Sequence, residues 1–311
     1  MKKLNTILLV IASLFMILGF SIAPQYKYNN NKPTITVTTT FLGDLVHEVL
    51  GDSVNLNILM GPGVDPHTYQ VSPSDLTKIY NSDLLIYQGI HLEGKFSEIL
   101  SEIDRPGLTV LEATKDIPRE QLITVSNAKG HQEYDPHIWF DPNLWTIVTR
   151  TVENQLLDLF PSLSQLIIGN SEKYIVNIDN MKQQVLDLVN QIPQEQRILI
   201  TSHDAFNYFV RFTNFEVRAI QGLSTVTEAS TKDMDELVKL ITSHYIKAVF
   251  VESSVSPKMI DSLTQAVIST GYDLKIGGTL YADSLGDYNT NDGNYCGMYI
   301  TNMTVIKNAL S

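Results

Sequence analysis

Hydrophobic positions along the chain alternate between short β-branched runs and longer stretches of helical spacing. Residues 34–40 are rich in threonine, isoleucine and valine, which is typical of a strand. Apolar residues from Phe41 to Leu50 then recur at helical spacing, and Gly51 follows as a helix cap. The same exchange repeats through residues 54–111 with short loops. This order of strand and helix predicts a parallel sheet covered by helices.

Helical spacing then dominates from Pro142 onward. A second helical span covers about Ser164 to Gln191, with no proline and with Gly169 as its one glycine. At about 1.5 Å per residue, such a helix reaches about 40 Å. We expect it to join two lobes as a rigid rod, and a long helix inside one domain is the alternative.

The strand and helix pattern of the first half returns after Pro193. The order of elements from Ile58 to Tyr87 is echoed from Ala219 to Val251. The predicted fold class is therefore α/β, with two lobes, each a mostly parallel β-sheet flanked by helices, joined by one long rigid helix. The predicted divisions are a signal peptide or signal anchor at 1–23, a tether at 24–33, an N-terminal α/β lobe at 34–160, a linking helix at 161–192 and a C-terminal α/β lobe at 193–311.

The first residues have the pattern of an export signal. Two lysines precede an almost wholly apolar run from Leu4 to Ala23, close to the roughly 20 residues that span a bilayer. Pro24 is a poor residue after a cleavage site, so an uncleaved anchor is favoured over a cleaved peptide. We expect an extracytoplasmic protein, at the cell surface or in the periplasm, anchored in the membrane by this segment.

Charge and cysteine content narrow the function classes. The chain of 311 residues has a formal net charge of −12 and no basic stripe, which argues against a nucleic-acid partner. Its one cysteine, Cys296, excludes a disulfide within the chain and a cysteine-based zinc cluster. A metal site would have to rely on histidine, aspartate or glutamate.

Four side chains with metal-binding chemistry lie in loops or directly after predicted strands. Ligands of open α/β sheets bind beyond the carboxyl ends of the strands, so these four are expected to meet in a cleft between the lobes. Three imidazoles and one carboxylate suit zinc, and manganese also accepts mixed nitrogen and oxygen ligands. Taken singly, each has another explanation, as a residue of a turn, of a helix cap or of a packed core. The four are His67, His137, His203 and Asp283.

Acidic neighbours are candidates for orienting these ligands. Asp135 or Asp141, each followed by a proline, is expected to accept the second ring N–H of His137, and Asp204 to support a neighbouring ligand.

Four short runs around these residues resemble the motifs of a known family. The runs Gly63–Tyr69 (GVDPHTY) and Asp135–Pro142 (DPHIWFDP), supported by Ser202–Phe206 and Leu280–Ser284, resemble the zinc and manganese receptors among the solute-binding proteins of ABC transporters. The resemblance covers nearly the whole chain after the tether. It implies two α/β lobes, one long linking helix and a metal buried between the lobes. It also implies that the ligands are His67, His137, His203 and Asp283.

Two departures from the family pattern bear on the metal. Zinc-specialised members often carry a histidine-rich loop before the second motif, whereas the polar residues 112–134 contain only His131. Many manganese members have glutamate as third ligand, whereas this chain has His203. The choice between Zn²⁺ and Mn²⁺ therefore stays open. The usual lipid-carrying cysteine is also absent near the end of the apolar run.

The predicted function is capture of one divalent transition metal ion and its delivery to an ABC importer. The implied partners are the metal ion, an ABC permease and its ATPase in the membrane, and the protein itself is expected to be a monomer and not an enzyme. One alternative is an extracytoplasmic zinc-dependent hydrolase, although no His-Glu-x-x-His motif is present. The other is a surface adhesin with a structural metal.

Overall fold

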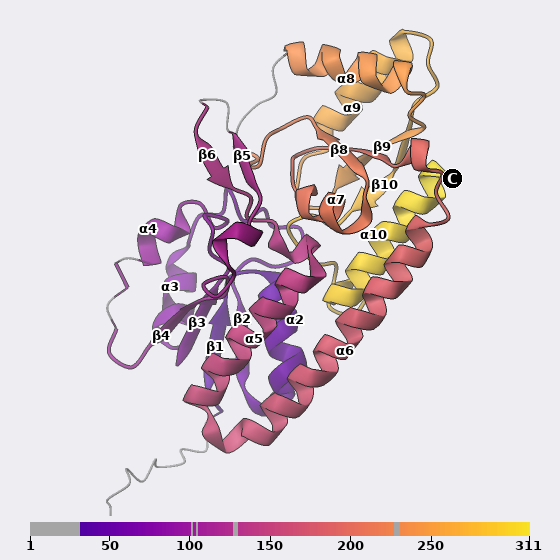
Figure 1. Cartoon of the computed structure of the whole chain (residues 1–311). Helices are drawn as coiled ribbons and strands as arrows, with labels where there is room; N and C mark the ends of the chain where they lie inside the picture. Colours follow the sequence, from indigo (N-terminus) through magenta and orange to yellow (C-terminus); the bar gives the residue numbers. More distant parts are fainter. Residues whose placement is uncertain (1–31, 101, 104, 127–129, 227–230) are drawn as a thin grey trace, which may run out of the picture. The chain divides into compact units, whose positions relative to one another are not determined.

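A four-stranded parallel sheet forms the first half of the described chain, in the order β2-β1-β3-β4 (Figure 1). The computed structural model describes residues 32–100, 102–103, 105–126, 130–226 and 231–311. The strands are β1 (Thr34–Val37), β2 (Asn55–Ile58), β3 (Leu84–Tyr87) and β4 (Thr109–Glu112), and the helices among them are α2 (Thr40–Leu50), α3 (Pro73–Tyr80) and α4 (Phe96–Leu100).

Side-chain caps set where these helices begin. The Thr39 hydroxyl accepts a hydrogen bond from the Leu42 N–H, so α2 starts at Thr40 and the predicted strand 34–40 ends early, at Val37. Ser72 and Asp75 form a capping box at the start of α3, as the sequence of that turn predicts.

The second half forms two parallel strand pairs, β7 with β8 and β9 with β10. β7 and β9 lie side by side, so the two strand pairs are neighbours. The predicted mostly parallel arrangement is confirmed here too. The elements are β7 (Ile198–Thr201), α7 (Asn207–Thr213), β8 (Glu216–Ala219), α8 (Thr231–Ser243), β9 (Ala248–Glu252), α9 (Lys258–Ser269) and β10 (Lys275–Leu280).

Three long helices pack together. They are α5 (Pro142–Leu159) and α6 (Ser164–Val189), which lie between the two halves in the sequence, and α10 (Tyr295–Leu310), which follows β10. The 26 residues of α6 span about 39 Å, and the helix packs along α2, α5 and α10 (Figure 1). The side chain of Asn294 accepts a hydrogen bond from the Gly297 N–H, so α10 begins at Tyr295. One continuous hydrophobic core includes Trp145, Ile178 and Met298 from these three helices.

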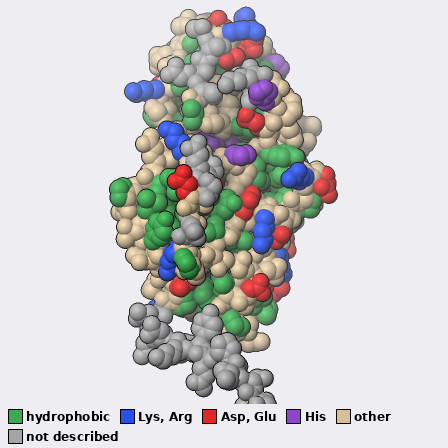
Figure 2. All heavy atoms as spheres, turned by 90° about the vertical axis from the view of Figure 1, so that its left-hand side faces the viewer, with side chains coloured by type: hydrophobic (Ala, Val, Ile, Leu, Met, Phe, Trp, Pro, Cys, Tyr) green, Lys and Arg blue, Asp and Glu red, His purple; other side chains and the backbone are tan. Residues whose placement is uncertain are grey.

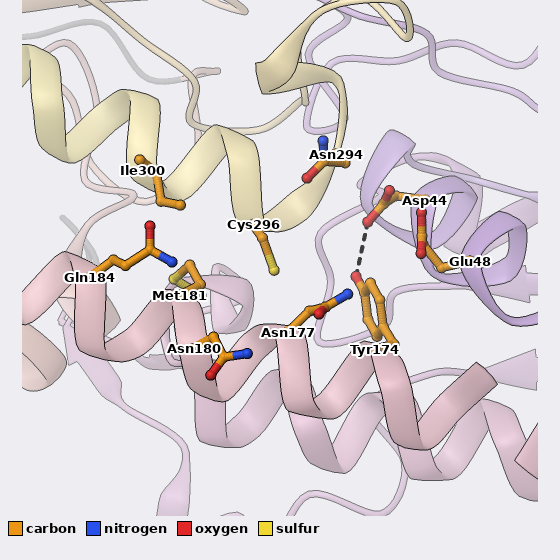
Figure 3. Close-up of a pocket in the computed structure, with 10 residues that line it drawn as sticks. All are labelled: Asp44, Glu48, Tyr174, Asn177, Asn180, Met181, Gln184, Asn294, Cys296 and Ile300. Atoms are coloured by element: carbon orange, nitrogen blue, oxygen red, sulfur yellow. Dashed lines mark hydrogen bonds between the residues drawn. The ribbon is translucent and has the colours of Figure 1, made fainter. Parts of the chain in front are cut away.

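A polar contact supports this helix packing. The Tyr174 hydroxyl on α6 donates a hydrogen bond of 2.9 Å to the Asp44 carboxylate on α2, which also accepts the Tyr295 N–H from α10 (Figure 3). Burial raises the pKa of Asp44 to about 7. The groove of about 410 Å³ beside this contact is lined by amide side chains, together with Glu48 and Cys296 (Figure 3).

Residues 112–134 form more structure than the sequence predicts. β5 (Thr124–Ser126) and β6 (Gln132–Tyr134) pair antiparallel within this polar segment. Most of their side chains face solvent, so the strands lack the alternation of apolar and polar positions that marks a half-buried strand.

Several expectations are not tested by these elements. The signal segment 1–23 and nearly all of the tether 24–33 lie outside the described residues. No helix in the described part of the chain is long and apolar enough to cross a membrane. Residues Pro33–Ser311 form one compact unit, and the lobe boundaries at 160 and 192 stay a prediction. On the face drawn in Figure 2, lysines and arginines are scattered among acidic side chains without forming a basic stripe.

Candidate metal site

The structure brings all four predicted side chains together at one buried point. His67 lies in the loop between β2 and α3, and His137 directly precedes the short 3₁₀ turn Ile138–Phe140. His203 follows β7 and Asp283 follows β10, so the second half contributes its ligands at strand ends, as predicted. His137 and His203 are fully buried, Asp283 is 2% exposed and His67 is 7% exposed.

The potential ligand atoms lie within 4.8 Å of one another, and both oxygens of Asp283 face the histidines. The Nε2 atom of His137 lies 3.2 Å from that of His67 and 3.3 Å from that of His203. The Asp283 carboxylate lies 3.3 Å from His203 Nε2, 3.5 Å from His137 Nε2 and 3.9 Å from His67 Nε2. Ligand bonds of about 2.0–2.1 Å in a tetrahedron place the ligand atoms about 3.3–3.4 Å apart. The observed separations therefore fit four ligands around one ion.

One buried carboxylate oxygen supports the same interpretation. Asp283 Oδ1 has no hydrogen-bond partner among the described residues, although its side chain is buried. Its other oxygen, Oδ2, accepts a long hydrogen bond of 3.4 Å from the Ser254 hydroxyl and lies 3.3 Å from the Nε2 atom of His203. A buried carboxylate that lacks donors is costly unless a cation satisfies it.

Asp135 orients His137, as predicted. Its Oδ1 accepts hydrogen bonds from the backbone N–H of His137 at 2.9 Å and from the ring Nδ1 at 2.7 Å. Asn207 donates to Asp135 Oδ2, and the Tyr208 hydroxyl donates to its backbone carbonyl, so α7 holds the orienting residue in place. With the proton on Nδ1, the Nε2 atom of His137 is free to bind a metal.

Glu252 has the same role for His203, and the sequence reasoning missed it. The Glu252 side chain at the end of β9 is buried and bonds the Nδ1 atom of His203. Its Oε1 also accepts the backbone N–H groups of Ser202 at 2.7 Å and His203 at 2.9 Å. The one sequence signal is an acid that ends a predicted buried strand, and that signal does not name its partner.

Of the two other candidate acids, Asp141 has a role different from the predicted one. Asp141 caps α5 and pairs with Arg211 at 2.6 Å, so the prediction that it could orient His137 is wrong. Asp204 donates its backbone N–H to Gly222, and no described hydrogen bond joins its carboxylate to a site histidine. The sequence reasoning also missed Asp65, whose Oδ1 accepts the backbone N–H of His67 at 2.8 Å.

Burial and charge set the protonation of the site. Burial lowers the pKa of His67 to about 4, so its ring is neutral at neutral pH. Burial also opposes a charged His203, but Asp283 and Glu252 outweigh it and raise its pKa well above the usual value. Burial would raise the pKa of Asp283, but His203 and the other two histidines hold it well below the usual range.

Comparison with known proteins places the chain in a family. The model of the ZnuA family, described as the periplasmic zinc-uptake complex component A, matches residues 35–309. The zinc-binding protein TroA of Treponema pallidum is 36% identical over 303 residues, which cover 97% of each chain. The manganese-binding lipoprotein MntA of Bacillus subtilis is 35% identical over the same length and coverage.

A solved structure shows the same fold. The structure of periplasmic zinc-binding protein TroA from Treponema pallidum superimposes with a TM-score of 0.86 at 37% identity, covering 90% of this chain and all of that one. Together with the match over residues 35–309, this similarity shows that the chain belongs to the ZnuA family of metal-binding solute-binding proteins of ABC transporters.

Proposed function

We propose that this protein captures one divalent transition metal ion with His67, His137, His203 and Asp283 and delivers it to an ABC importer. The observation that carries the proposal is that these four buried side chains converge. One oxygen of the Asp283 carboxylate, Oδ1, has no hydrogen-bond donor among the described residues. The receiving partners are a membrane permease and its ATPase, as the family implies. Members of this family are transport binding proteins and not enzymes.

Four protein ligands also argue against the hydrolase alternative. A catalytic zinc site keeps one position open for water, whereas a structural or carrier site is closed by protein ligands. The three histidines and Asp283 supply a full tetrahedral set.

We further propose that the protein acts outside the cytoplasm. The matching family is described as periplasmic, and the relative from Bacillus subtilis is named a lipoprotein. Cys296, the one cysteine of the sequence, lies on α10 and is not placed to carry an N-terminal lipid. The apolar residues 1–23 would serve as the membrane anchor instead, and the protein would work as a monomer.

Zinc is expected to bind more tightly than manganese in a direct competition. The two relatives named above are described as binding different metals, so the ligand set has to decide. Three imidazole nitrogens favour zinc, because divalent ions at such sites follow the order in which Mn²⁺ binds weakest. Titration of the purified protein with each metal, in the presence of the other, measures the ratio. A higher affinity for Mn²⁺ would show that geometry, and not ligand type, sets selectivity here.

Metal binding is expected to release about one proton per ion at neutral pH. The raised pKa of His203 means that its ring carries both protons in the metal-free protein, between Glu252 and Asp283. A metal ion on Nε2 of His203 must replace one of those protons. The neutral ring of His67 can bind the ion without a net loss of a proton. Affinity should therefore fall about tenfold for each unit by which the pH drops.

Calorimetry in two buffers with different ionisation enthalpies measures this proton release directly. If the observed heat is the same in both buffers, no proton leaves and the assigned protonation of His203 is wrong. The variant Glu252→Gln should release less than the parent, because it removes one of the two carboxylates that keep His203 protonated.

A further inference from the structure

Both halves of the chain make contact with the carboxylate of Asp65. Its Oδ1 accepts the backbone N–H of His67, which fixes the loop that presents this ligand. Its Oδ2 accepts two hydroxyl groups, from Thr68 at 2.9 Å and from Thr225 at 2.6 Å. Thr68 belongs to the same loop, whereas Thr225 lies 160 residues further on, in the loop after β8.

These three residues lie on the solvent side of the site. His67 is the most exposed of the four candidate ligands, while His137 and His203 are fully buried. Asp65 and Thr225 are half-buried, and Thr68 is exposed. Of the four candidate ligands, His67 is therefore the one closest to solvent, and its loop carries the contact between Asp65 and Thr225.

Buried hydrogen bonds hold the other side of the site closed. The indole N–H of Trp139 donates to the Ala282 carbonyl at 2.9 Å, and the Leu285 N–H donates to the Thr40 hydroxyl at 2.8 Å. Both bonds are buried and fix the loop of Asp283 against the first half of the chain. The Gly63 N–H donates to the Ser284 hydroxyl at 2.9 Å, a half-buried bond that ties the start of the His67 loop to the Asp283 loop.

The half-buried contact between Thr225 and Asp65 is consequently a weaker point of this closure than the two buried bonds. Exposed polar contacts open at lower free energy than buried ones, because water replaces the lost partner. Once Thr225 withdraws, Thr68 is the one donor among the described residues that remains on Asp65 Oδ2, and Thr68 belongs to the His67 loop.

We infer that the hydrogen bond from Thr225 to Asp65 is a latch that positions His67 and sets the rate at which the metal ion leaves. This inference rests on the proposed function, since it takes His67 as a ligand. It assigns Asp65 and Thr225 as positioning residues that do not touch the ion. Opening the latch frees the His67 loop and leaves the other three ligands in place.

Release of zinc from the full chain into an excess of a zinc-binding dye tests this inference. Thr225→Val keeps the shape and removes the hydroxyl, and we expect release to become about five- to tenfold faster with the rate of binding changed less than about twofold. Thr68→Val is the matched control, because it removes the other hydroxyl from the same oxygen, and its release rate should match that of the parent. Thr225→Ser keeps the hydroxyl and should restore slow release.

Three outcomes would overturn the latch. They are release of zinc from Thr225→Val at the parental rate, acceleration of release by Thr68→Val as large as that by Thr225→Val, and release from Thr225→Ser as fast as from the valine variant. Each of these results leaves stoichiometric zinc binding by the parent intact. A parent chain that binds no zinc would instead refute the proposed function.

Discussion

A variant with both His67→Ala and His203→Ala is expected to bind zinc at least about a thousandfold more weakly than the parent chain. Zinc bound by four protein ligands gains about 10–16 kcal/mol in apparent free energy, or about 2.5–4 kcal/mol for each ligand. The double variant keeps only His137 and Asp283, one ligand from each half of the chain. Competition with a chelator of known affinity measures the loss.

The matched control replaces two histidines outside the site. His47 on α2 and His244 after α8 are both exposed, and replacing both with alanine should leave zinc affinity within about twofold of the parent. If the site variant binds zinc as tightly as this control, the assignment of the ligands is wrong.

Replacing Glu252 with glutamine is expected to weaken zinc binding by about ten- to a hundredfold, although Glu252 is not itself a candidate ligand. The carboxylate bonds the Nδ1 atom of His203 and receives two backbone N–H groups. An amide keeps the size of the side chain but loses the charge that makes the imidazole a stronger ligand. Zinc titration of the variant at fixed pH measures the change.

Glu153→Gln provides the comparison for a buried glutamate. Glu153 on α5 is buried and pairs with Arg150 at 2.7 Å, on a helix away from the four ligands. Its replacement should reduce the stability of the metal-free fold without changing zinc affinity. Equal effects of the two substitutions on affinity would mean that Glu252 acts through general stability and not through His203.

Local signals in the sequence predict the elements of this fold well. The helix predicted over Phe41–Leu50 is found as α2, and the long helix α6 ends two residues before the predicted Gln191. Each of these segments has a periodic apolar pattern that stands apart from its flanks. The polar strands β5 and β6 have no such pattern, and the pairing between them cannot be read from either strand alone.

The candidate site divides in the same way between local and distant contacts. Asp135 lies two residues before His137, so its role follows from the sequence of one turn. Glu252 lies 49 residues after His203, and the two meet only because β7 and β9 are neighbours. Asp141 also stands beside a proline near His137, but it lies at the start of α5 and caps that helix. Sequence spacing alone does not separate these two aspartates.

Metal content of the purified chain tests the central claim most directly. The protein is loaded with zinc, freed of excess metal by dialysis, and measured by elemental analysis together with its thermal unfolding midpoint. The account predicts about one zinc ion per chain and a higher midpoint than that of the metal-free protein, because an ion that binds only the folded state stabilises it. A chain that retains no stoichiometric zinc or manganese, and whose midpoint neither metal raises, would contradict it.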